Sequence, residues 1–597
     1  MNTLQKYKRT HTCGELRGSD KDKKVRLSGW VNKRRDLGGL IFVDIRDRYG
    51  LTQVFFDPKV SENLFKLAEE LKQEYVISVE GTVALRPDGM INSSMPTGEI
   101  EIHADSLNIL NESAVLPFNM SELQNTDENL RMKYRYLDLR RQPMVDKMIL
   151  RHKAARAIRE YFDANGFLEI ETPTLMSSTP EGARDYLVPS RVQPGKVYAL
   201  PQSPQLFKQL LMVGGMDRYF QLAKCYRDED LRADRQPEFT QIDLEMSFVE
   251  REDVLNMIEG MLKYLFEKAL DRPITEPLPR MTWHEAMDLY GCDKPDLRYP
   301  MIIKDVSKNL KDCGFQVFDS TLSAGGHIRA ITVPNAGAVS RKESDEIINM
   351  GKSFGLAGVV TLAFNEGAPK SPLTKFMSPE RVTEIKNIME AGDNDLVLFA
   401  AGEQRAISVA LGKLRLWLVE KFKMQPSTDF ALLWVLDFPM FSFNEEENRL
   451  EAEHHAFTSP MPEDIGLMET EPIKVRSNAY DVVLNGVELG SGSIRIHDRK
   501  LQEMIFKIMG LTSEQAVEKF GFLLKAFEFG APPHGGIALG FDRLVSIMAE
   551  QDSIREIIAF PKNHQAICPM TNAPVTPAQE QLDMLKIKFD VKETVKA

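Results

Sequence analysis

Cysteine is scarce in this chain, and long hydrophobic runs are missing from it. The 597 residues include only five cysteines, at positions 13, 225, 292, 313 and 568, and no two of them form a CxxC pair. This scatter argues against a zinc site and a disulfide framework, so a reducing cytoplasm fits. No stretch approaches the about 18 consecutive apolar residues that a membrane span needs. The opening MNTLQKYKRTHT has no apolar run either, so we expect no secretory signal.

What is present is typical of a globular protein with several domains. Hydrophobic residues make up 43% and charged residues 27% of the chain, which is ordinary, and the length exceeds that of one domain. The net charge of −12 is unevenly spread: residues 1–48 hold 13 Lys and Arg against 6 Asp and Glu, or +7, which leaves −19 for the rest. A basic N-terminal segment on an otherwise acidic chain is consistent with nucleic acid contacting that segment. From charge alone, a merely solvated basic face is an equally good interpretation.

The first 110 residues are rich in short β-type segments. Five segments with one helical interval, at 61–72, match a small OB-type barrel, a fold whose open face stacks single-stranded bases. On that face Phe42 could stack a base and Gln53 could hydrogen-bond a base edge; each could equally be scaffold. The predicted strands are 25–35, 40–47, 51–57, 75–85 and 99–110. The candidate residues for the open face are Arg35, Phe42, Gln53, Glu99 and Glu101.

The most informative stretch is a charged segment between two β-type arms. Residues 219–226 and 239–248 alternate apolar and polar side chains, which predicts an antiparallel hairpin with a long ionic loop. Such a loop could be a solvated tip. However, Arg227 stands at the strand end, where an arginine suits bidentate phosphate binding. Phe239, on the return strand, offers a flat surface to a base.

Two further segments flank this hairpin in the chain. The segment from 146 has apolar residues at helical spacing, Asn165-Gly166 supplies a left-handed stop, and FLEIETPTL predicts a strand closed by Pro173. Far downstream, YDVVLNGVELGSGSIRIHD alternates and then becomes glycine-rich, so the backbone can approach a ligand closely. Arg495 at its end could bind a carboxylate by two hydrogen bonds, or form a structural ion pair with an acid such as Asp243.

Two patterns are not expected to form the sites that their residue types suggest. His454 and His455 are adjacent, so on a strand they would point apart, and a shared metal is not expected. Gly351-Lys352-Ser353 has the ending of a phosphate-binding loop, but Glu346 stands where the loop needs its first glycine.

These motifs resemble those of a known family. Tyr226-Arg227-Asp228-Glu229 with Phe239 resembles motif 2 of the class II aminoacyl-tRNA synthetases, and RDEDLRADRQPEFTQID resembles the aspartyl branch. The helix–strand–proline pattern is similar to motif 1, which builds the dimer interface in the family. GAPPHGGIALGFDRLVSIMA is similar to motif 3. The resemblance implies ATP, Mg²⁺, L-aspartate and tRNA-Asp as ligands, a homodimer, and no membrane.

The resemblance also implies an α+β multidomain fold. It places an antiparallel class II sheet with flanking helices after an OB-fold β-barrel, with an inserted α/β GAD-like domain. The expected parts are the OB-fold anticodon-binding domain (1–112), a hinge (113–145), the catalytic domain with motifs 1 and 2 (146–290), the GAD-like insertion (291–428), the catalytic domain with motif 3 (429–565) and a C-terminal extension (566–597).

The family's site residues can be placed on this sequence one by one. The implied catalytic residues are Arg227, Glu488 and Arg543. Aspartate would be bound by Glu181, Gln205, Lys208, Arg227, Asp243, His454 and Arg495. ATP would be bound by Arg227, Asp228, Glu229, Gln236, Phe239, Glu488, Gly540, Phe541, Asp542 and Arg543. Mg²⁺ would reach the ATP phosphates through Asp481 and Glu488, and the anticodon would contact Arg35, Phe42, Gln53 and Glu101.

The implied activity is ligation of aspartate to tRNA-Asp, and one alternative concerns the tRNA. Some aspartyl enzymes charge both tRNA-Asp and tRNA-Asn. Leu37 resembles the discriminating form and Gly89 the relaxed one, and we favour the tRNA-Asp-specific form. An asparaginyl or lysyl enzyme would share the plan without the insertion. A non-catalytic RNA-binding relative would be expected to have lost Arg227, Glu488 or Arg543, and all three are present.

Overall fold

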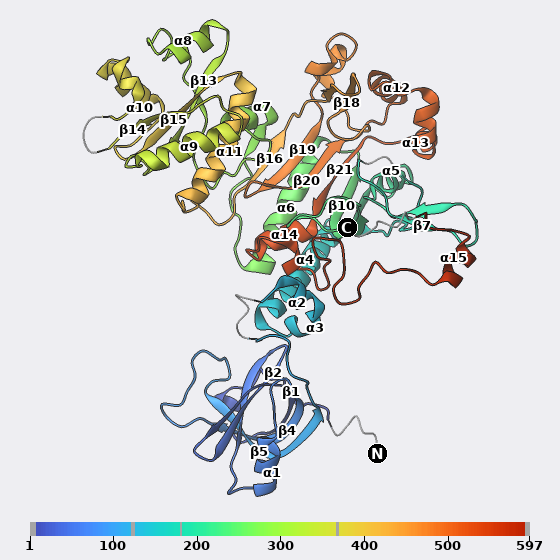
Figure 1. The fold of residues 1–597 in the computed structure, drawn as a ribbon. Helices are drawn as coiled ribbons and strands as arrows, with labels where there is room; N and C mark the ends of the chain where they lie inside the picture. The colour runs from blue at the N-terminus through green and yellow to red at the C-terminus, as the bar shows by residue number, and fades with distance from the viewer. Residues whose placement is uncertain (1–6, 121–125, 179–181, 366–368, 591–597) are drawn as a thin grey trace. The chain divides into compact units, whose positions relative to one another are not determined.

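The computed structural model describes residues 7–120, 126–178, 182–365 and 369–590. It divides the chain into two compact units (Figure 1). The first consists of residues 1–149 with 555–575, and the second of residues 150–554 with 576–597. No helix within the described ranges is both long and apolar enough to cross a membrane.

The first unit begins with a closed five-stranded barrel. Its strand order is β1-β2-β3-β5-β4, and every pair is antiparallel except β3 with β5. One short helix, α1 (Glu62–Glu69), follows β3, with the Ser61 side chain capping its N-terminus. The strands are β1 (Lys24–Leu37), β2 (Leu40–Asp47), β3 (Gly50–Phe56), β4 (Val76–Leu85) and β5 (Ile100–Asn111). The predicted OB-type barrel with one helix is thereby confirmed.

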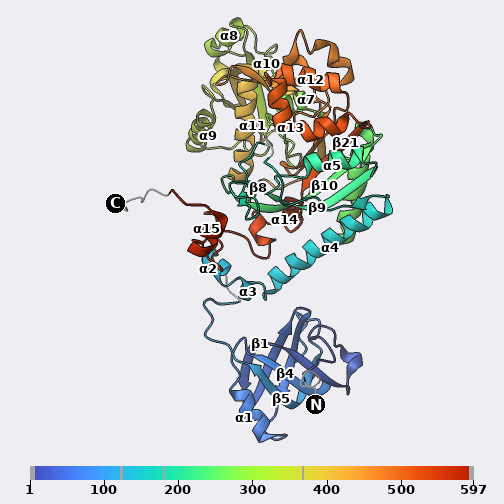
Figure 2. The same ribbon diagram turned by 90° about the vertical axis from the view of Figure 1, so that its right-hand side faces the viewer.

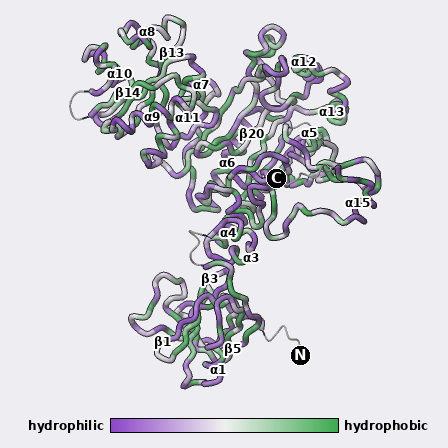
Figure 3. The backbone as a smooth tube through the Cα atoms, viewed as in Figure 1, coloured by the Kyte–Doolittle hydropathy of each residue, from purple (hydrophilic) through white to green (hydrophobic). Residues whose placement is uncertain are grey.

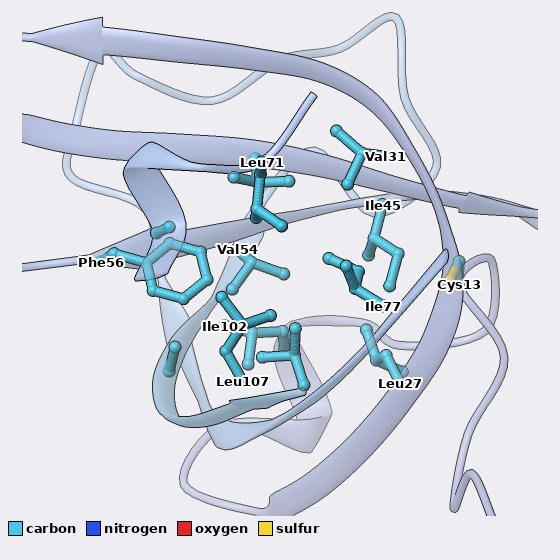
Figure 4. Packing of buried hydrophobic residues seen from close by; sticks show 14 of the residues in the cluster. Cys13, Leu27, Val31, Ile45, Val54, Phe56, Leu71, Ile77, Ile102 and Leu107 are labelled. Carbon is cyan, nitrogen blue, oxygen red and sulfur yellow. The ribbon is translucent and has the colours of Figure 1, made fainter. Parts of the chain in front are cut away.

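The barrel closes because its strands alternate between an apolar interior and a polar exterior. Along β1 every second residue from Val25 to Val31 is buried, and polar and apolar stretches alternate in the same way along the tube in Figure 3. Val31, Ile45, Val54, Ile77 and others fill the interior (Figure 4). Residues that alternate with the buried ones on β2, β3 and β5 therefore face outward, and these include Phe42, Gln53 and Glu101. On β1 a register shift between Val31 and Lys33 brings Arg35, which pairs with Phe42, to the same outer face.

Short helices continue the first unit after the barrel. They are α2 (Glu128–Lys133) and α3 (Arg135–Asp138), and residues 555–575 pack with them. Arg135 is buried and donates to the carbonyl oxygens of Arg555, Ile558 and Ala559 at 2.8–3.0 Å. Since one guanidinium satisfies three carbonyl oxygens, it fixes residues 555–559 against helix α3. The long helix α4 (Gln142–Ala164) contains the boundary between the units and ends at Gly166, whose φ is +77°.

The second unit is built on an eight-stranded sheet of order β11-β16-β19-β20-β21-β10-β9-β6 (Figure 1). All neighbours are antiparallel except β11 with β16 and β6 with β9. The predicted hairpin is present as β9 and β10, with Glu238 opposite Tyr226. The strands are β6 (Leu168–Glu169), β9 (Arg218–Tyr226), β10 (Glu238–Ser247), β11 (Arg280–Thr282), β16 (Leu432–Leu436), β19 (Ala479–Leu484), β20 (Val487–Ile494) and β21 (His534–Gly540).

Helices complete the layers around this sheet. α5 (Gln205–Val213) and α14 (Phe541–Met548) both pack along β10, and α6 (Arg251–Leu270) packs against β21. The indole of Trp434 on β16 donates to Glu259 of α6 at 3.1 Å. α4, α5 and α14 are seen from the side in Figure 2.

The strand predicted after α4 is much shorter than expected. Only Leu168 and Glu169 form β6, and the rest of FLEIETPTL leaves the sheet. β6 is an edge strand that pairs only with β9, and Pro173 has no N–H to donate, so little holds the segment in the ladder.

Residues between β11 and β16 form a separate layered module. Its sheet, β12-β13-β15-β14, is covered on both faces, by α9 and α11 on one and by α8 and α10 on the other (Figures 1 and 2). On β13, Ile331 and Val333 face the first pair, and Ile328 and Ala330 face the second. The elements are β12 (Lys304–Asp305), α8 (Gln316–Ser323), β13 (His327–Val333), α9 (Arg341–Ser353), β14 (Val360–Ala363), α10 (Pro379–Ile388), β15 (Leu396–Gly402) and α11 (Gln404–Lys421). Gly351-Lys352-Ser353 ends helix α9 and forms no phosphate loop.

Candidate active site

One large cavity, of about 750 Å³, opens on the eight-stranded sheet. The hairpin β9–β10 with its ionic loop, the strands β20 and β21, and the first turns of α5 and α14 line it. Twelve of the residues predicted for ATP or aspartate lie in its wall. They are Gln205, Lys208, Arg227, Glu229, Gln236, Phe239, His454, Glu488, Arg495, Gly540, Asp542 and Arg543.

Four other predicted residues that the structure describes are not part of that wall. Asp243 lies directly behind it, bonded to Lys208, and Asp481 lies behind His454. Asp228 is half exposed and pairs with Arg184 at 3.6 Å, outside the cavity. Phe541 is buried under the guanidinium of Arg151, because the first turn of α14 points it into the core. Glu181 lies outside the described residues.

One end of the cavity combines a cation with an aromatic face. The Arg227 guanidinium carbon lies 5.2 Å from the centre of the Phe239 ring. The two residues meet because Arg227 directly follows β9 and Phe239 stands near the start of β10. A planar group can stack on the ring while the guanidinium holds an anion beside it. This is the arrangement that the sequence predicted for a base and a phosphate.

Arg543 enters the same end from the first turn of α14. It donates to the Glu488 carbonyl oxygen at 2.5 Å and to Asp234 of the ionic loop at 2.9 Å. Its neighbour Asp542 accepts a hydrogen bond from the backbone N–H of Thr240 at 2.6 Å and pairs with Arg151 at 2.5 Å. Asp542 therefore joins the start of α14 to strand β10 and stabilises this part of the cavity wall.

The closed end of the cavity carries buried charges of both signs. Lys208 Nζ lies 2.8 Å from Asp243 Oδ1 and 3.2 Å from Glu245 Oε2, and all three side chains are almost fully buried. Asp243 and Glu245 share one face of β10 because side chains alternate along a strand. Burial raises the pKa of Asp243 although Lys208 opposes it. For Glu245, burial is outweighed by Arg495 and Lys208, and its pKa is lowered.

Arg495 is already heavily engaged within the protein. Its guanidinium donates to Glu245 at 2.9 and 3.3 Å, to the Ser493 hydroxyl at 2.7 Å and to the Gly536 carbonyl oxygen at 3.3 Å. Those contacts use four of its five N–H donors. The sequence suggested that Arg495 binds one carboxylate through two hydrogen bonds. In the structure that carboxylate belongs to Glu245, and not to Asp243. One N–H remains for a ligand in the cavity.

The two histidines lie in a turn after β18 (Arg449–Ala452), so the strand expected there is wrong. They nevertheless have different surroundings. His454 packs edge-on against Phe438 and lies 3.8 Å from Asp481, whose effect outweighs burial and raises the pKa of His454. His455 stacks on Phe457, and burial together with Arg495 and Lys208 lowers its pKa to about 3, so its ring is neutral at pH 7. Within the described ranges, no three His, Cys, Asp or Glu residues gather as a metal cluster.

Asp481 and Glu488 fit a role in holding Mg²⁺ on a phosphate ligand. Burial and the neighbouring Asp481 charge raise the pKa of Glu488. Asp481 Oδ1 is buried and has no hydrogen-bond partner. Two carboxylates whose negative charges repel each other suit a hard divalent cation. Mg²⁺ that is bound to phosphates commonly has only one or two protein carboxylates as ligands.

Unpartnered polar atoms gather at this cavity. Among the described residues, twelve buried side-chain polar atoms lack a hydrogen-bond partner, and five of them belong to residues predicted for this site. Buried polar groups are normally paired, so such a concentration indicates a place that awaits a polar ligand. The five atoms are Gln205 Nε2, Arg227 Nε, Asp243 Oδ2, His454 Nδ1 and Asp481 Oδ1.

A second candidate site lies on the outer face of the barrel. Arg35 donates to Asp44 at 2.6 Å and to Gln53 Oε1 at 3.1 Å, and Gln53 Nε2 donates to Glu101 at 2.9 Å. His103 continues the chain at 3.0 Å from Glu101. The network spans four strands and fixes the orientation of each member, including the Gln53 amide.

Aromatic rings border this network. Phe42 is half-buried and its ring centre lies 5.3 Å from that of Phe55, so it is not a core residue. Leu37 is 60% exposed at the end of β1, and Gly89 occupies a left-handed conformation in the loop after β4. Glu99 instead accepts a hydrogen bond from the Gly18 N–H at 2.6 Å and does not join the network.

Sequence reasoning missed Glu245, which lies directly behind the cavity wall, and His455 and Lys294, which line the cavity. Glu245 could have been found, because it follows Asp243 at period two on the same strand. His455 was considered only for a metal site shared with His454. Lys294 has no local signal at all: it follows α7 (Trp283–Tyr290) and reaches Glu488 Oε2 at 3.3 Å only through the tertiary fold.

Comparison with known proteins identifies the family. Residues 127–564 match the family described as tRNA synthetases class II (D, K and N), and residues 25–110 match the OB-fold nucleic acid binding domain. A Caldanaerobacter subterraneus subsp. tengcongensis protein named aspartate--tRNA(Asp/Asn) ligase is 52% identical over 584 residues, 98% of this chain and 99% of that protein. A Halothermothrix orenii protein of the same name is 51% identical over 588 residues, 98% and 100% of the two chains.

Solved structures show the same fold at low sequence identity. Asparaginyl-tRNA synthetase from Pyrococcus horikoshii complexed with asparaginyl-adenylate aligns with a TM-score of 0.59 at 19% identity, over 92% of this chain and 97% of that one. Aspartyl tRNA synthetase from Entamoeba histolytica aligns with a TM-score of 0.59 at 18% identity, over 94% and 92%. Both the family match, over most of the chain, and the full-length relatives at about half identity lead to one conclusion: the chain belongs to the class II tRNA synthetases of the D, K and N group.

Proposed function

We propose that the chain is an aspartate–tRNA ligase. It activates L-aspartate with ATP to give aspartyl-adenylate and pyrophosphate, and then transfers aspartate to the 3′-terminal adenosine of tRNA-Asp. The observation that carries the proposal is the convergence of Arg227, Arg495 and Arg543, from three distant segments, on one cavity. The names of the relatives at about 50% identity support aspartate as the amino acid.

The closed end of the cavity suits a small zwitterion with an extra carboxylate. Lys208 and Arg495 supply positive charge, and Asp243 and Glu245 supply negative charge, from side chains that are almost fully buried. An α-ammonium group and carboxylates can each find an opposite charge there. Asparagine carries no side-chain anion and would leave a cation unmatched, which can reject a substrate by roughly 10⁴.

The first step is an in-line attack of the aspartate α-carboxylate on the ATP α-phosphate. Phe239 stacks the adenine, with Arg543 on the opposite side, and Arg227 stabilises the charge that develops on the phosphorus oxygens. Catalysis is therefore positioning plus electrostatics. Mg²⁺ held through Glu488 and Asp481 would neutralise phosphate charge when bound.

In the second step, the terminal ribose hydroxyl of the tRNA attacks the mixed anhydride. An oxygen of the adenylate phosphate can accept the proton, so the step needs no protein base. His455 is neutral at pH 7 and buried beside Arg495, which suits hydrogen bonding rather than proton transfer.

The test is ATP–pyrophosphate exchange with aspartate, asparagine and lysine in turn. Exchange that depends on aspartate supports the proposal. Exchange with asparagine or lysine alone would reassign the chain to another member of the group. No exchange with any of the three would favour an RNA-binding protein without catalysis.

The barrel is assigned to the tRNA anticodon, through Arg35, Phe42, Gln53 and Glu101. A second candidate function is the charging of both tRNA-Asp and tRNA-Asn, and the names of the relatives favour it, since each reads tRNA(Asp/Asn). Leu37 alone points to the specific form. Aminoacylation of purified tRNA-Asn with aspartate decides: charging at a rate near that of tRNA-Asp establishes the dual enzyme, and its absence establishes the specific one.

Two further parts of the proposal concern assembly and location. A homodimer through the motif 1 segment is supported by two leucines of that segment, Leu168 and Leu175, which are each about half exposed. Light scattering at micromolar concentration tests it. The five cysteines all lie in the described part of the chain and form no disulfide there, which fits a reducing cytoplasm.

A further inference from the structure

The segment that enters the inserted module is held at a close helix crossing. At its start, Gly291 ends α7 with φ of +69°, and a Cβ there would lie 2.0 Å from the Ser408 carbonyl oxygen of α11. A Cβ on Gly412 would lie 2.4 Å from the Tyr290 carbonyl oxygen. Both positions need glycine because the two backbones touch. The start of the segment therefore has a fixed position relative to α11.

The far side of the same segment is fixed by a buried arginine. The Arg415 side chain, on α11, is only 1% exposed. It donates to the carbonyl oxygens of Asp296, Tyr299 and Met301 at 2.6, 2.5 and 2.9 Å. Three of the five N–H donors of this guanidinium bond to backbone carbonyl oxygens of the segment, and these bonds fix the path of the chain.

The turn between β19 and β20 also touches this segment. A Cβ on Gly486 would lie 3.0 Å from the Cβ of Asp296, so the segment lies close against the start of the strand that carries Glu488. Residues 291 and 296 are thus anchored, and the residues between them have little freedom to leave the cavity.

Lys294 stands between these anchors and lines the cavity. Its Nζ lies 3.3 Å from Glu488 Oε2 and 3.8 Å from Asp293. The side chain is 44% exposed, so the ammonium can swing on its flexible stem while the backbone stays fixed. On this side of the cavity, the neighbouring cation Arg543 is already bonded to Asp234 and to a carbonyl oxygen.

We propose that Lys294 is a binding residue for the β- and γ-phosphates of the nucleotide. The inference rests on the proposed function in that the ligand is ATP. In the absence of a ligand, the Lys294 ammonium compensates the negative charge of the Glu488 carboxylate. When the Mg²⁺ complex of the triphosphate is bound, Glu488 would help to hold the metal ion, and the Lys294 ammonium would donate to the phosphate oxygens, which carry more charge than one carboxylate. The inserted module thereby contributes to the first step by presenting Lys294.

The alternative is that Lys294 only keeps the buried Glu488 in place. The two roles predict different ligand dependence, since a scaffold residue affects every ligand of the cavity. A polyphosphate-binding residue affects only ligands that carry the terminal phosphates. A sulfamoyl analogue of aspartyl-adenylate has the adenosine and the aspartyl group but no pyrophosphate, so it separates the roles.

The experiment measures binding of Mg²⁺-ATP and of that analogue by titration calorimetry, without tRNA. Lys294→Met is expected to weaken ATP binding by about tenfold, which is the loss of one charge-assisted contact, and to leave the analogue within about twofold. Lys294→Arg is expected to recover most of the ATP affinity. Lys308→Ala removes an exposed lysine of the same module and is the matched control, with no change expected.

Unchanged ATP affinity in Lys294→Met would overturn the proposal, and so would an equal loss of affinity for the analogue. Thermal unfolding of each variant shows whether the cavity is intact. ATP binding needs no amino acid, so these results stand whichever amino acid the exchange assay identifies. Failure of aspartate exchange in the wild type would instead count against the proposed function.

Discussion

Arg495 Nε lies 2.9 Å from Glu245 Oε1 although 250 positions separate the two residues in the chain. Both side chains are almost completely buried, so each needs the opposite charge of the other to compensate for its loss of hydration. Lys208 approaches the same carboxylate at 3.2 Å and joins it to Asp243. The amino acid pocket is thus a preformed set of two cations and two anions, into which a substrate must insert with its own charges matched.

Arg495→Leu is expected to reduce aspartate-dependent pyrophosphate exchange by at least about 10³-fold, because the pocket loses a cation and Glu245 is left less compensated. The same loss should lower the free energy of unfolding by about 3–5 kcal/mol, the usual effect of breaking a buried pair. Circular dichroism first shows that the variant is folded, and pyrophosphate exchange is then measured on that folded protein. Arg499→Leu, on the exposed side of α12 (Arg499–Ile508), is the control and should keep both properties. Exchange near the wild-type rate would contradict the role of Arg495.

Phe239→Ala is expected to raise the KM for ATP by about tenfold, because stacking of a base on an aromatic ring contributes about 1–3 kcal/mol. The KM for aspartate should change little, since Lys208 and Asp243 are not disturbed. Initial rates of exchange over an ATP series measure the effect. Phe443→Ala removes a ring that is 53% exposed on β17 (Phe441–Asn444) and should have no effect. Equal changes in both KM values would indicate a distorted cavity instead of a lost stacking partner.

Gln53→Ala is expected to lower kcat/KM for tRNA-Asp by about tenfold or more, the cost of one base-edge hydrogen bond. ATP–pyrophosphate exchange requires no tRNA and should stay at the wild-type rate. Arg35 and Glu101 orient the Gln53 amide, so the effect should also appear, more weakly, in Glu101→Gln. Aminoacylation and exchange assays on the same preparations give both values. A loss of exchange, or unchanged aminoacylation, would remove Gln53 from the anticodon site.

Glu556 gives a prediction for the dependence of stability on pH. Burial opposes its ionisation, but Arg131 and Lys147, both at 3.0 Å, lower its pKa to about 2. A depressed carboxyl pKa stabilises the fold above the unfolded value, near 4.5, and that contribution is lost as the pH falls towards 2. Glu556→Gln should therefore lower the free energy of unfolding by about 2–3 kcal/mol at pH 7.

The difference between wild type and Glu556→Gln should narrow between about pH 4.5 and 2. Urea unfolding at a series of pH values measures it. Glu580→Gln, an exposed carboxyl on α15 (Gln579–Leu585), serves as the control. A difference that stayed constant down to pH 3 would mean that the ion pairs of Glu556 do not account for its effect.

Local patterns in the sequence were enough for much of the fold. Period-two alternation located the barrel strands and the hairpin β9–β10, and helical spacing followed by Asn165-Gly166 located the end of α4. The same rules placed Arg227 and Phe239 on the two arms of one hairpin, beside its loop, where they meet. These features depend on contacts within a few residues or across one turn, so the sequence shows them directly.

Where the structure differs from what the sequence suggested, competition among distant groups is the cause. A two-point contact from Arg495 to a ligand was expected, but Glu245 occupies those donors. The strand after α4 was expected to be long, but only one neighbour pairs with it. Phe541 was expected at the nucleotide, but the helix start turns it into the core. None of these outcomes has a local signature.

By itself, the sequence determined the residue types, the alternation that forms the strands, and the motifs that assign the chain to its family. Only the tertiary structure decided which charges share a cavity and which of their donors remain free for a ligand. The physical reason is that hydrophobic periodicity is a local property, whereas the pairing of buried charges depends on distances between segments hundreds of residues apart. Lys294 beside Glu488 is the clearest case, since 194 positions separate them and contacts with α11 and with the β19–β20 turn hold the first near the second.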